Sequence, residues 1–92
     1  MILEALSNGS VDGTGVIQMR ERYLGGVLIT TDGTNAVTVA VHLNDVNGKK
    51  IFEIATDSTI FVKAPISLEG ESVIYYSVAG TGGKAQFYAH AE

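Results

Sequence analysis

Two histidines, His42 and His90, are the residues best suited to metal binding or proton transfer in this 92-residue sequence. Each falls on the polar face of a predicted strand, and neither has a second ligand at the spacing of a helix or hairpin. The sequence contains no Cys, which excludes both a disulfide framework and a thiolate zinc site. We therefore interpret both histidines as solvated strand residues and expect no metal and no other cofactor.

Two short segments resemble ligand-binding loops. Residues 45–48, Asp-Val-Asn-Gly, alternate acidic and amide oxygens before a glycine, as calcium loops do, but the closing bidentate Glu is missing. Residues 82–84, Gly-Gly-Lys, look like the end of a phosphate loop, but Ala85 replaces the required hydroxyl residue and no helix is expected to follow. Both segments are better explained as turns between strands.

Residues for acid–base or nucleophilic catalysis are present without a recognisable arrangement. Glu69 and Glu71 flank a turn glycine, where full hydration gives the two carboxylates no distinct acid and base roles. No Gly-x-Ser-x-Gly motif is found, and a triad would have to combine scattered serines with exposed histidines. We predict that the chain is not an enzyme.

The charge and hydropathy of the chain limit the classes of partner that it is expected to bind. Ten acidic and six basic residues give a net charge of -4, and their scattered placement argues against a nucleic-acid binder. No stretch approaches the roughly 20 apolar residues that span a bilayer, and the first residues lack the basic start of a signal peptide. We expect a soluble, unprocessed chain that binds neither nucleic acid nor membrane.

Glycine-containing turn signals recur along the chain and separate short strand-like runs. The clearest run is 35–43, where valines alternate with polar or small residues, the period of a half-buried strand. Seven or more such runs predict an all-β domain, a small antiparallel β-sandwich or Greek-key barrel-like fold of about seven to eight strands. Residues 25–92 would form the body of this single domain. Residues 1–24 are less regular and would be either an irregular N-terminal arm or the first strands.

Several predicted strands are apolar on both faces, including residues 27–29, 60–62 and 73–76. A two-layer sandwich normally alternates apolar and polar residues, so these second faces would expose a large apolar patch. We therefore predict a homo-oligomer, with a trimer favoured. The residues expected at the interface with another copy or a partner are Ile2, Leu3, Leu6, Ile17, Met19, Tyr23, Ile74, Tyr76 and Tyr88. The competing interpretation is a central strand with rim tyrosines whose hydroxyls reach water.

Exposed tyrosines allow a second function class, a carbohydrate-binding or cell-surface-binding module. Stacking of a sugar on an aromatic ring requires no charge, so the acidic composition does not oppose it. Tyr75, Tyr76 and Tyr88 are the candidate stacking residues for this alternative.

From Tyr23 onward the order of features resembles the β-sandwich virion proteins of tailed bacteriophages, particularly capsid decoration (cement) proteins. The residues that carry the resemblance are the strand at 25–30, the valine strand at 37–43, the turn at 45–50, the run at 50–54, and the closing residues at 65–70, 73–80 and 85–89. The resemblance implies a non-enzymatic, often trimeric protein, made in the host cytoplasm and bound at the capsid surface between major capsid subunits. Neck, tail or fibre proteins are other virion roles with the same features.

Overall fold

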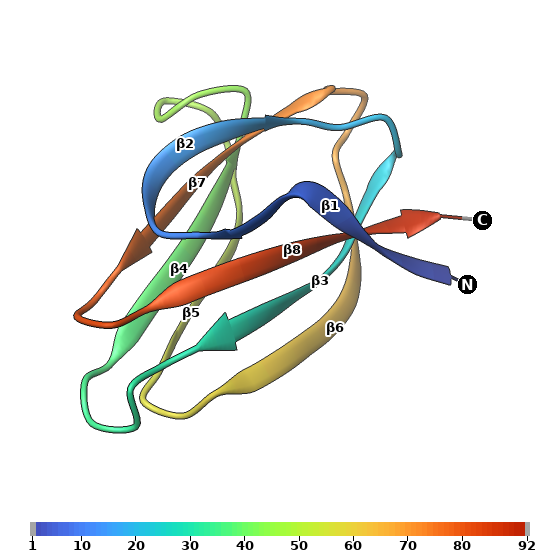
Figure 1. Cartoon of the computed structure of the whole chain (residues 1–92). Helices are drawn as coiled ribbons and strands as arrows, with labels where there is room; N and C mark the ends of the chain where they lie inside the picture. Colours follow the sequence, from blue (N-terminus) through green and yellow to red (C-terminus); the bar gives the residue numbers. More distant parts are fainter. Residues whose placement is uncertain (1, 92) are drawn as a thin grey trace.

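A computed structural model describes residues 2–91, together with their side chains except those of residues 2, 7, 8, 64 and 91. Within this range the chain is all β, as predicted, and no described segment is a helix that could cross a membrane. The strands, drawn in Figure 1, are β1 (Ile2–Val11), β2 (Gly13–Gln18), β3 (Tyr23–Thr30), β4 (Val37–Leu43), β5 (Lys50–Thr56), β6 (Ile60–Ser67), β7 (Val73–Ala79) and β8 (Lys84–Ala91).

The eight strands form two four-stranded antiparallel sheets. Sheet A has the order β1-β8-β3-β6 and sheet B the order β2-β7-β4-β5. Consecutive strands change sheet at every connection except that from β4 to β5, which pair directly. This order is that of a jelly roll, a β-sandwich built from two Greek keys. The predicted sandwich class is therefore confirmed. The start of β1 and the end of β8 lie on the same side of the molecule (Figure 1).

The core lies between the two sheets and is supplied by alternate residues of each strand. On β4 the side chains of Val37, Val39, Val41 and Leu43 are all buried, as the alternating pattern predicts. Phe87 of β8 faces them from sheet A and is 1% exposed. The described side chains include no buried polar or charged residue, so apolar burial is the main contribution to the stability of this domain.

Residues 2–18 form two strands, β1 and β2, and not an irregular arm. β1 pairs with β8 in sheet A, and β2 pairs with β7 in sheet B, so the chain crosses from one sheet to the other at Asp12. The register of β1 shifts between Ala5 and Ser10, which is the irregular part of this segment. Of the two alternatives left open by the sequence, the first strands are the correct one, because partner strands from the far end of the chain supply the hydrogen bonds.

Two adjacent glycines in the middle of β3 are required by close packing on the outer face of sheet A. A Cβ atom on Gly25 would lie 2.5 Å from Leu3 Cδ2, and one on Gly26 would lie 2.8 Å from Phe61 Cζ. The two larger side chains therefore occupy the space above the glycine backbone. Gly25-Gly26 is a packing feature of a strand in this protein, not a turn.

The connection between β3 and β4 is organised by Asp32. Its carboxylate accepts hydrogen bonds from the backbone N–H groups of Asn35 and Thr34, each at 2.8 Å, and from the Asn35 side-chain amide at 2.8 Å. These hydrogen bonds, with that of the Asn35 backbone the largest, lower the pKa of Asp32. The charged carboxylate thus fixes a loop at the end of the sandwich.

Candidate binding surfaces

The outer face of sheet A carries a group of apolar and aromatic side chains, here called the aromatic face. The strand register places Leu3 opposite His90 and Leu28 opposite Phe61, on the side away from the core. The larger described side chains of this face, contributed by all four strands of sheet A, are Leu3, Tyr23, Leu28, Phe61, Tyr88 and His90. A single layer of strands therefore brings together side chains from both ends of the sequence.

Two edge-to-face ring pairs organise the aromatic face. The rings of Phe61 and Tyr88 have centroids 5.4 Å apart at 83°, and those of Tyr23 and His90 are 5.8 Å apart at 68°. Edge-to-face pairs at such distances are favourable because the positive ring edge meets the negative ring face. Phe61 remains 43% exposed and Tyr23 38% exposed, so water still reaches a substantial part of the face.

The charged residues in register on the same side of sheet A are both basic. Lys63 pairs with Gly26 and Lys84 pairs with Thr30, so both side chains share the side of the aromatic face. Glu4 pairs with Ala89, whose buried side chain faces the core, and so lies on the other side of the sheet. The aromatic face is thus locally positive on a chain whose net charge is -4.

The outer face of sheet B is more polar. Tyr75 lies beside His42, with ring centroids 6.1 Å apart, and Lys50 forms an ion pair of 3.1 Å with Glu53. Val16, on edge strand β2, is 58% exposed and is the main large apolar residue in contact with water here. An isolated exposed valine is ordinary on a protein surface, so this face is the weaker candidate for an interface.

Three of the predicted interface residues belong to the core of the chain itself, which corrects the prediction. Ile17 is 3% exposed, Met19 4% and Ile74 0%. Ile17 and Ile74 lie opposite each other on β2 and β7 and point between the sheets. A side chain that is buried within its own domain has no exposed surface for contact with a partner.

The other predicted interface residues have mixed positions. Leu3, Tyr23 and Tyr88 are on the aromatic face, whereas Leu6 is half-buried against the core. Tyr76 also packs against the core, with its ring 5.7 Å from that of Phe87. The side chain of Ile2 lies outside the described residues. Leu28, Phe61 and His90 were not among the predicted interface residues, although residues 27–29 and 60–62 are apolar on both faces, which is the signal of an outward apolar residue in each run.

The three tyrosines proposed for sugar stacking do not form one platform. Tyr75 is on the outer face of sheet B, and Tyr88 is on the outer face of sheet A. Tyr76 points between the sheets, where its ring occupies the space that a side chain on Gly15 would need. A single ligand therefore cannot stack on all three rings.

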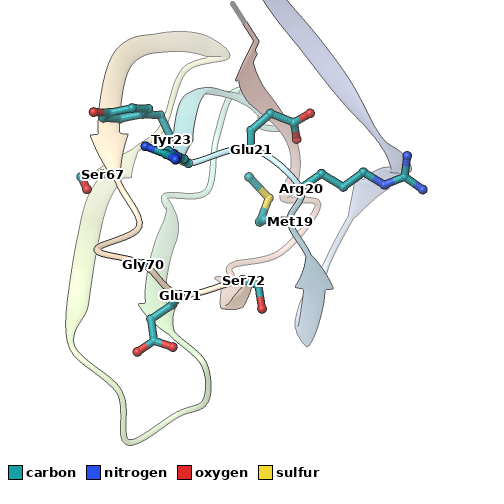
Figure 2. A pocket seen from close by; sticks show the side chains of 9 residues that line it. Met19, Arg20, Glu21, Tyr23, Ser67, Gly70, Glu71 and Ser72 are labelled. Carbon is teal, nitrogen blue, oxygen red and sulfur yellow. The ribbon is translucent and has the colours of Figure 1, made fainter.

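A polar cleft of about 550 Å³ opens at one end of the sandwich, here called the end cleft (Figure 2). It lies between the β2–β3 connection and the β6–β7 connection. The lining residues are Met19, Arg20, Glu21, Arg22, Tyr23, Ser67, Gly70, Glu71 and Ser72. Figure 2 shows Met19 near the middle of this group, with Arg20 extending away from the others.

Backbone hydrogen bonds join the two connections that form the end cleft. The Met19 N–H donates to the Ser72 carbonyl at 2.7 Å, and the Leu68 N–H donates to the Arg22 carbonyl at 3.0 Å. Met19 and Leu68 are also buried in the core, at 4% and 0% exposure. The walls of the cleft are therefore fixed to the sandwich from both sides.

The segments that resembled ligand loops are turns, as predicted. Asp45 Oδ1 accepts the Asn47 N–H at 2.9 Å, and the Asp45 carbonyl accepts the Gly48 N–H at 2.9 Å. Gly83 donates to the Gly80 carbonyl at 3.1 Å, and β8 begins directly afterwards. Both segments therefore form local turns held by hydrogen bonds between near neighbours in the sequence.

The two histidines lie on different sheets, His42 on β4 and His90 on β8. Each has a buried Nδ1 without a hydrogen-bond partner, and each lies beside a tyrosine ring. Among residues 2–91, no three His, Asp or Glu side chains cluster in a way that could hold a metal ion. The structure therefore keeps the two histidines apart.

Comparison with known proteins gives no relative: no protein-family model, curated protein or solved structure matches the chain.

Proposed function

We propose that this protein is a structural component of a bacteriophage virion that decorates the capsid and stabilises contacts between major capsid subunits. In this proposal it acts as a homo-oligomer, with a trimer favoured, on the capsid surface. Neck, tail and fibre positions are alternative sites in the virion for the same binding surface. The jelly roll is used by viral capsid proteins and also by lectins, so the fold is compatible with the proposal without selecting it.

The aromatic face is the observation that carries the proposal. Phe61 and Tyr23 expose large rings on the same side of sheet A as Lys63 and Lys84, and the other side of this sheet packs on the core. Interfaces are enriched in aromatic residues, and a rigid surface loses little entropy on binding. A partner with an apolar centre and acidic rim would complement this face.

The size of the aromatic face indicates what the partner must cover. Four strands spaced by about 4.8 Å, each of about eight residues rising about 3.4 Å, give a flat area of roughly 500 Å². A stable protein interface buries about 800 Å² on each partner. The interface in a virion would therefore extend beyond sheet A onto neighbouring loops, or involve contacts with more than one subunit.

The proposal is tested by mixing the purified protein with undecorated shells of the major capsid protein encoded with it. We expect the wild-type protein to sediment with the shells and Phe61→Glu to bind at least 10-fold more weakly, because a carboxylate would be desolvated in the interface. Val16→Glu places the same charge on the exposed edge of sheet B and is the matched control. It should bind as the wild type does.

Two results would count against the proposal. One is a wild-type protein that stays monomeric by light scattering and does not sediment with the shells. The other is equal binding by Phe61→Glu and Val16→Glu, which would show that the aromatic face is not the contact surface.

A further inference from the structure

We propose that the free edge of β5 binds a second copy of this chain, whose own β5 pairs with it antiparallel across a two-fold axis. β5 is the last strand of sheet B and pairs only with β4 among the described residues. The outer edge of such a strand presents a row of backbone N–H and C=O groups, and another extended strand is the partner that matches this row. The contact is separate from the aromatic face, which lies on sheet A, and it does not rest on the proposed role in a virion.

The other three edge strands have features that oppose pairing with a further strand. β6 contains Lys63 and Pro65, and the register of β1 shifts between Ala5 and Ser10. β2 is only six residues long and includes two glycines. Lysine, proline, bulges and short length are the usual protection of sheet edges. The register shift of β5 lies at its start, so residues 52–56 form a regular strand with no proline, glycine or lysine.

The apolar side chains along this side of the sandwich are incompletely covered. Ile54 of β5 lies opposite Val39, and Val62 of β6 lies opposite Val27. Val39 and Val27 are 0% and 1% exposed, whereas Ile54 and Val62 are only half-buried although they face the same core. The half-buried apolar residues of β5 and β6 are Ile51, Phe52, Ile54, Ile60, Val62 and Ile66. A strand added beyond β5 would cover part of this margin.

The sequence of β5 favours one register with a second β5. With the two-fold axis at Ile54, Glu53 of each copy lies opposite Ala55 of the other, and both residues are exposed on the outer face. An axis at Glu53 would oppose the two carboxylates, and an axis at Ala55 would place Glu53 opposite Asp57. Like charges directly opposite each other are destabilising. Of the three central positions of the regular segment, Ile54 is therefore the one that keeps the carboxylates apart.

The area of this contact predicts a weak dimer. Seven residues rising about 3.4 Å each give an edge of roughly 24 Å, and the smallest dimension of the molecule is 19 Å. The contact would cover roughly 450 Å² on each copy, whereas a standard interface covers about 800 Å². Contacts of this size are typical of transient complexes. A two-fold contact can also join copies that belong to two trimers, because closed assemblies combine two-fold and three-fold axes.

Disulfide cross-linking between copies tests the register, and the chain has no Cys of its own to interfere. Glu53→Cys and Ala55→Cys are mixed and oxidised. Directly opposite residues are about 4.5–5.5 Å apart at Cβ, whereas two copies of one residue would be diagonal neighbours about 7–8 Å apart. We expect the mixture to form a cross-linked dimer about 10-fold faster than either variant alone, because only the shorter separation suits a disulfide.

Ala79→Cys mixed with Glu53→Cys is the matched control. Ala79 is an exposed alanine on the same face of sheet B, and it lies in the same row as Ala55 because both are opposite Thr38. It is on β7, two strands in from the edge, so this mixture should cross-link slowly.

Two charge changes at Ala55 test the same register without a cross-link. Ala55→Glu would place a second carboxylate opposite Glu53 at two symmetric positions, so the dimer measured by analytical ultracentrifugation should weaken about 10-fold. Ala55→Lys would place an ammonium group opposite each Glu53, and this variant should associate at least as tightly as the wild type. Ala79→Glu adds the same charge away from the edge and should leave the association unchanged.

Three results would overturn the proposal. The first is equally slow cross-linking by all mixtures. The second is faster cross-linking by one variant alone than by the mixture of Glu53→Cys and Ala55→Cys, which would show a different register. The third is equal association of Ala55→Glu and Ala55→Lys. None of these measurements uses capsid shells, and Ala55 lies on sheet B, so failure here is distinct from failure of the shell-binding test.

Discussion

Replacing Ile74 with alanine distinguishes a core residue from an interface residue. The change removes three carbon atoms from a side chain that is 0% exposed. Ile74 lies on β7, between Ile17 of β2 and Leu43 of β4 in register, so the neighbouring strands limit how far the site can collapse.

The size of the effect follows from this burial. The lost transfer free energy is about 2.4 kcal/mol, at about 0.8 kcal/mol for each carbon. The remaining cavity adds about 1 kcal/mol, giving a total loss of about 3 to 4 kcal/mol. A 92-residue domain has a free energy of unfolding of roughly 5 to 14 kcal/mol, so Ile74→Ala should remain folded but be strongly destabilised.

Urea denaturation followed by circular dichroism measures this loss. With a slope of roughly 1 kcal/mol per molar urea, the midpoint should fall by roughly 3 M. Val16→Ala is the matched control, because Val16 is 58% exposed on adjacent strand β2, and it should cost less than about 1 kcal/mol. An unchanged midpoint for Ile74→Ala, together with a smaller oligomer by light scattering, would refute the core assignment and restore Ile74 to an interface.

Two further predictions concern the β3–β4 and β7–β8 connections, which lie at the end of the sandwich opposite the end cleft. Gly80→Ala should cost about 2 kcal/mol or more in urea denaturation, because Gly80 has φ 136° and an added Cβ would collide with the Ala36 carbonyl. Gly33→Ala, with φ 85° and no neighbour within 4 Å, should cost less; equal losses would contradict the steric explanation. Asp32, whose pKa is lowered chiefly by the Asn35 backbone hydrogen bond, should stabilise the folded state above the ordinary pKa of 3.8. That contribution is lost as the pH falls below 3.8, so wild-type stability should fall more steeply there than that of Asp32→Asn; parallel curves would show that the loop carboxylate contributes nothing.

The sequence was sufficient for the fold class because its strongest signals are local. The alternation of Val37, Val39 and Val41 has the period of a strand, and it marks the face that the structure buries. The turns at 45–48 and 82–84 were predictable for the same reason, since Asn, Asp and Gly favour the backbone angles of turns. These patterns depend on neighbours in the sequence alone.

The N-terminal strands and the interface residues could not be placed with the same certainty. Gly-rich residues 7–15 lack alternation, and their strands form because β7 and β8 lie beside them. Apolar residues on both faces of a strand indicate that both faces are covered. They do not indicate whether the second face is covered by the same domain or by a partner. Ile17, Met19 and Ile74 are buried by other core residues of the same domain.

Alternation and turn chemistry act over a few residues, so local patterns along the chain are enough to predict short antiparallel strands around an apolar core. Which distant segments share a surface depends on how the strands are arranged in space. The jelly-roll order places β1 beside β8 and β3 beside β6, which assembles the aromatic face from residues 3 to 90. It also joins residues 19–23 to residues 67–72 at the end cleft. Pairing between strands far apart in the sequence depends on the packing of the whole domain, and no local pattern encodes it.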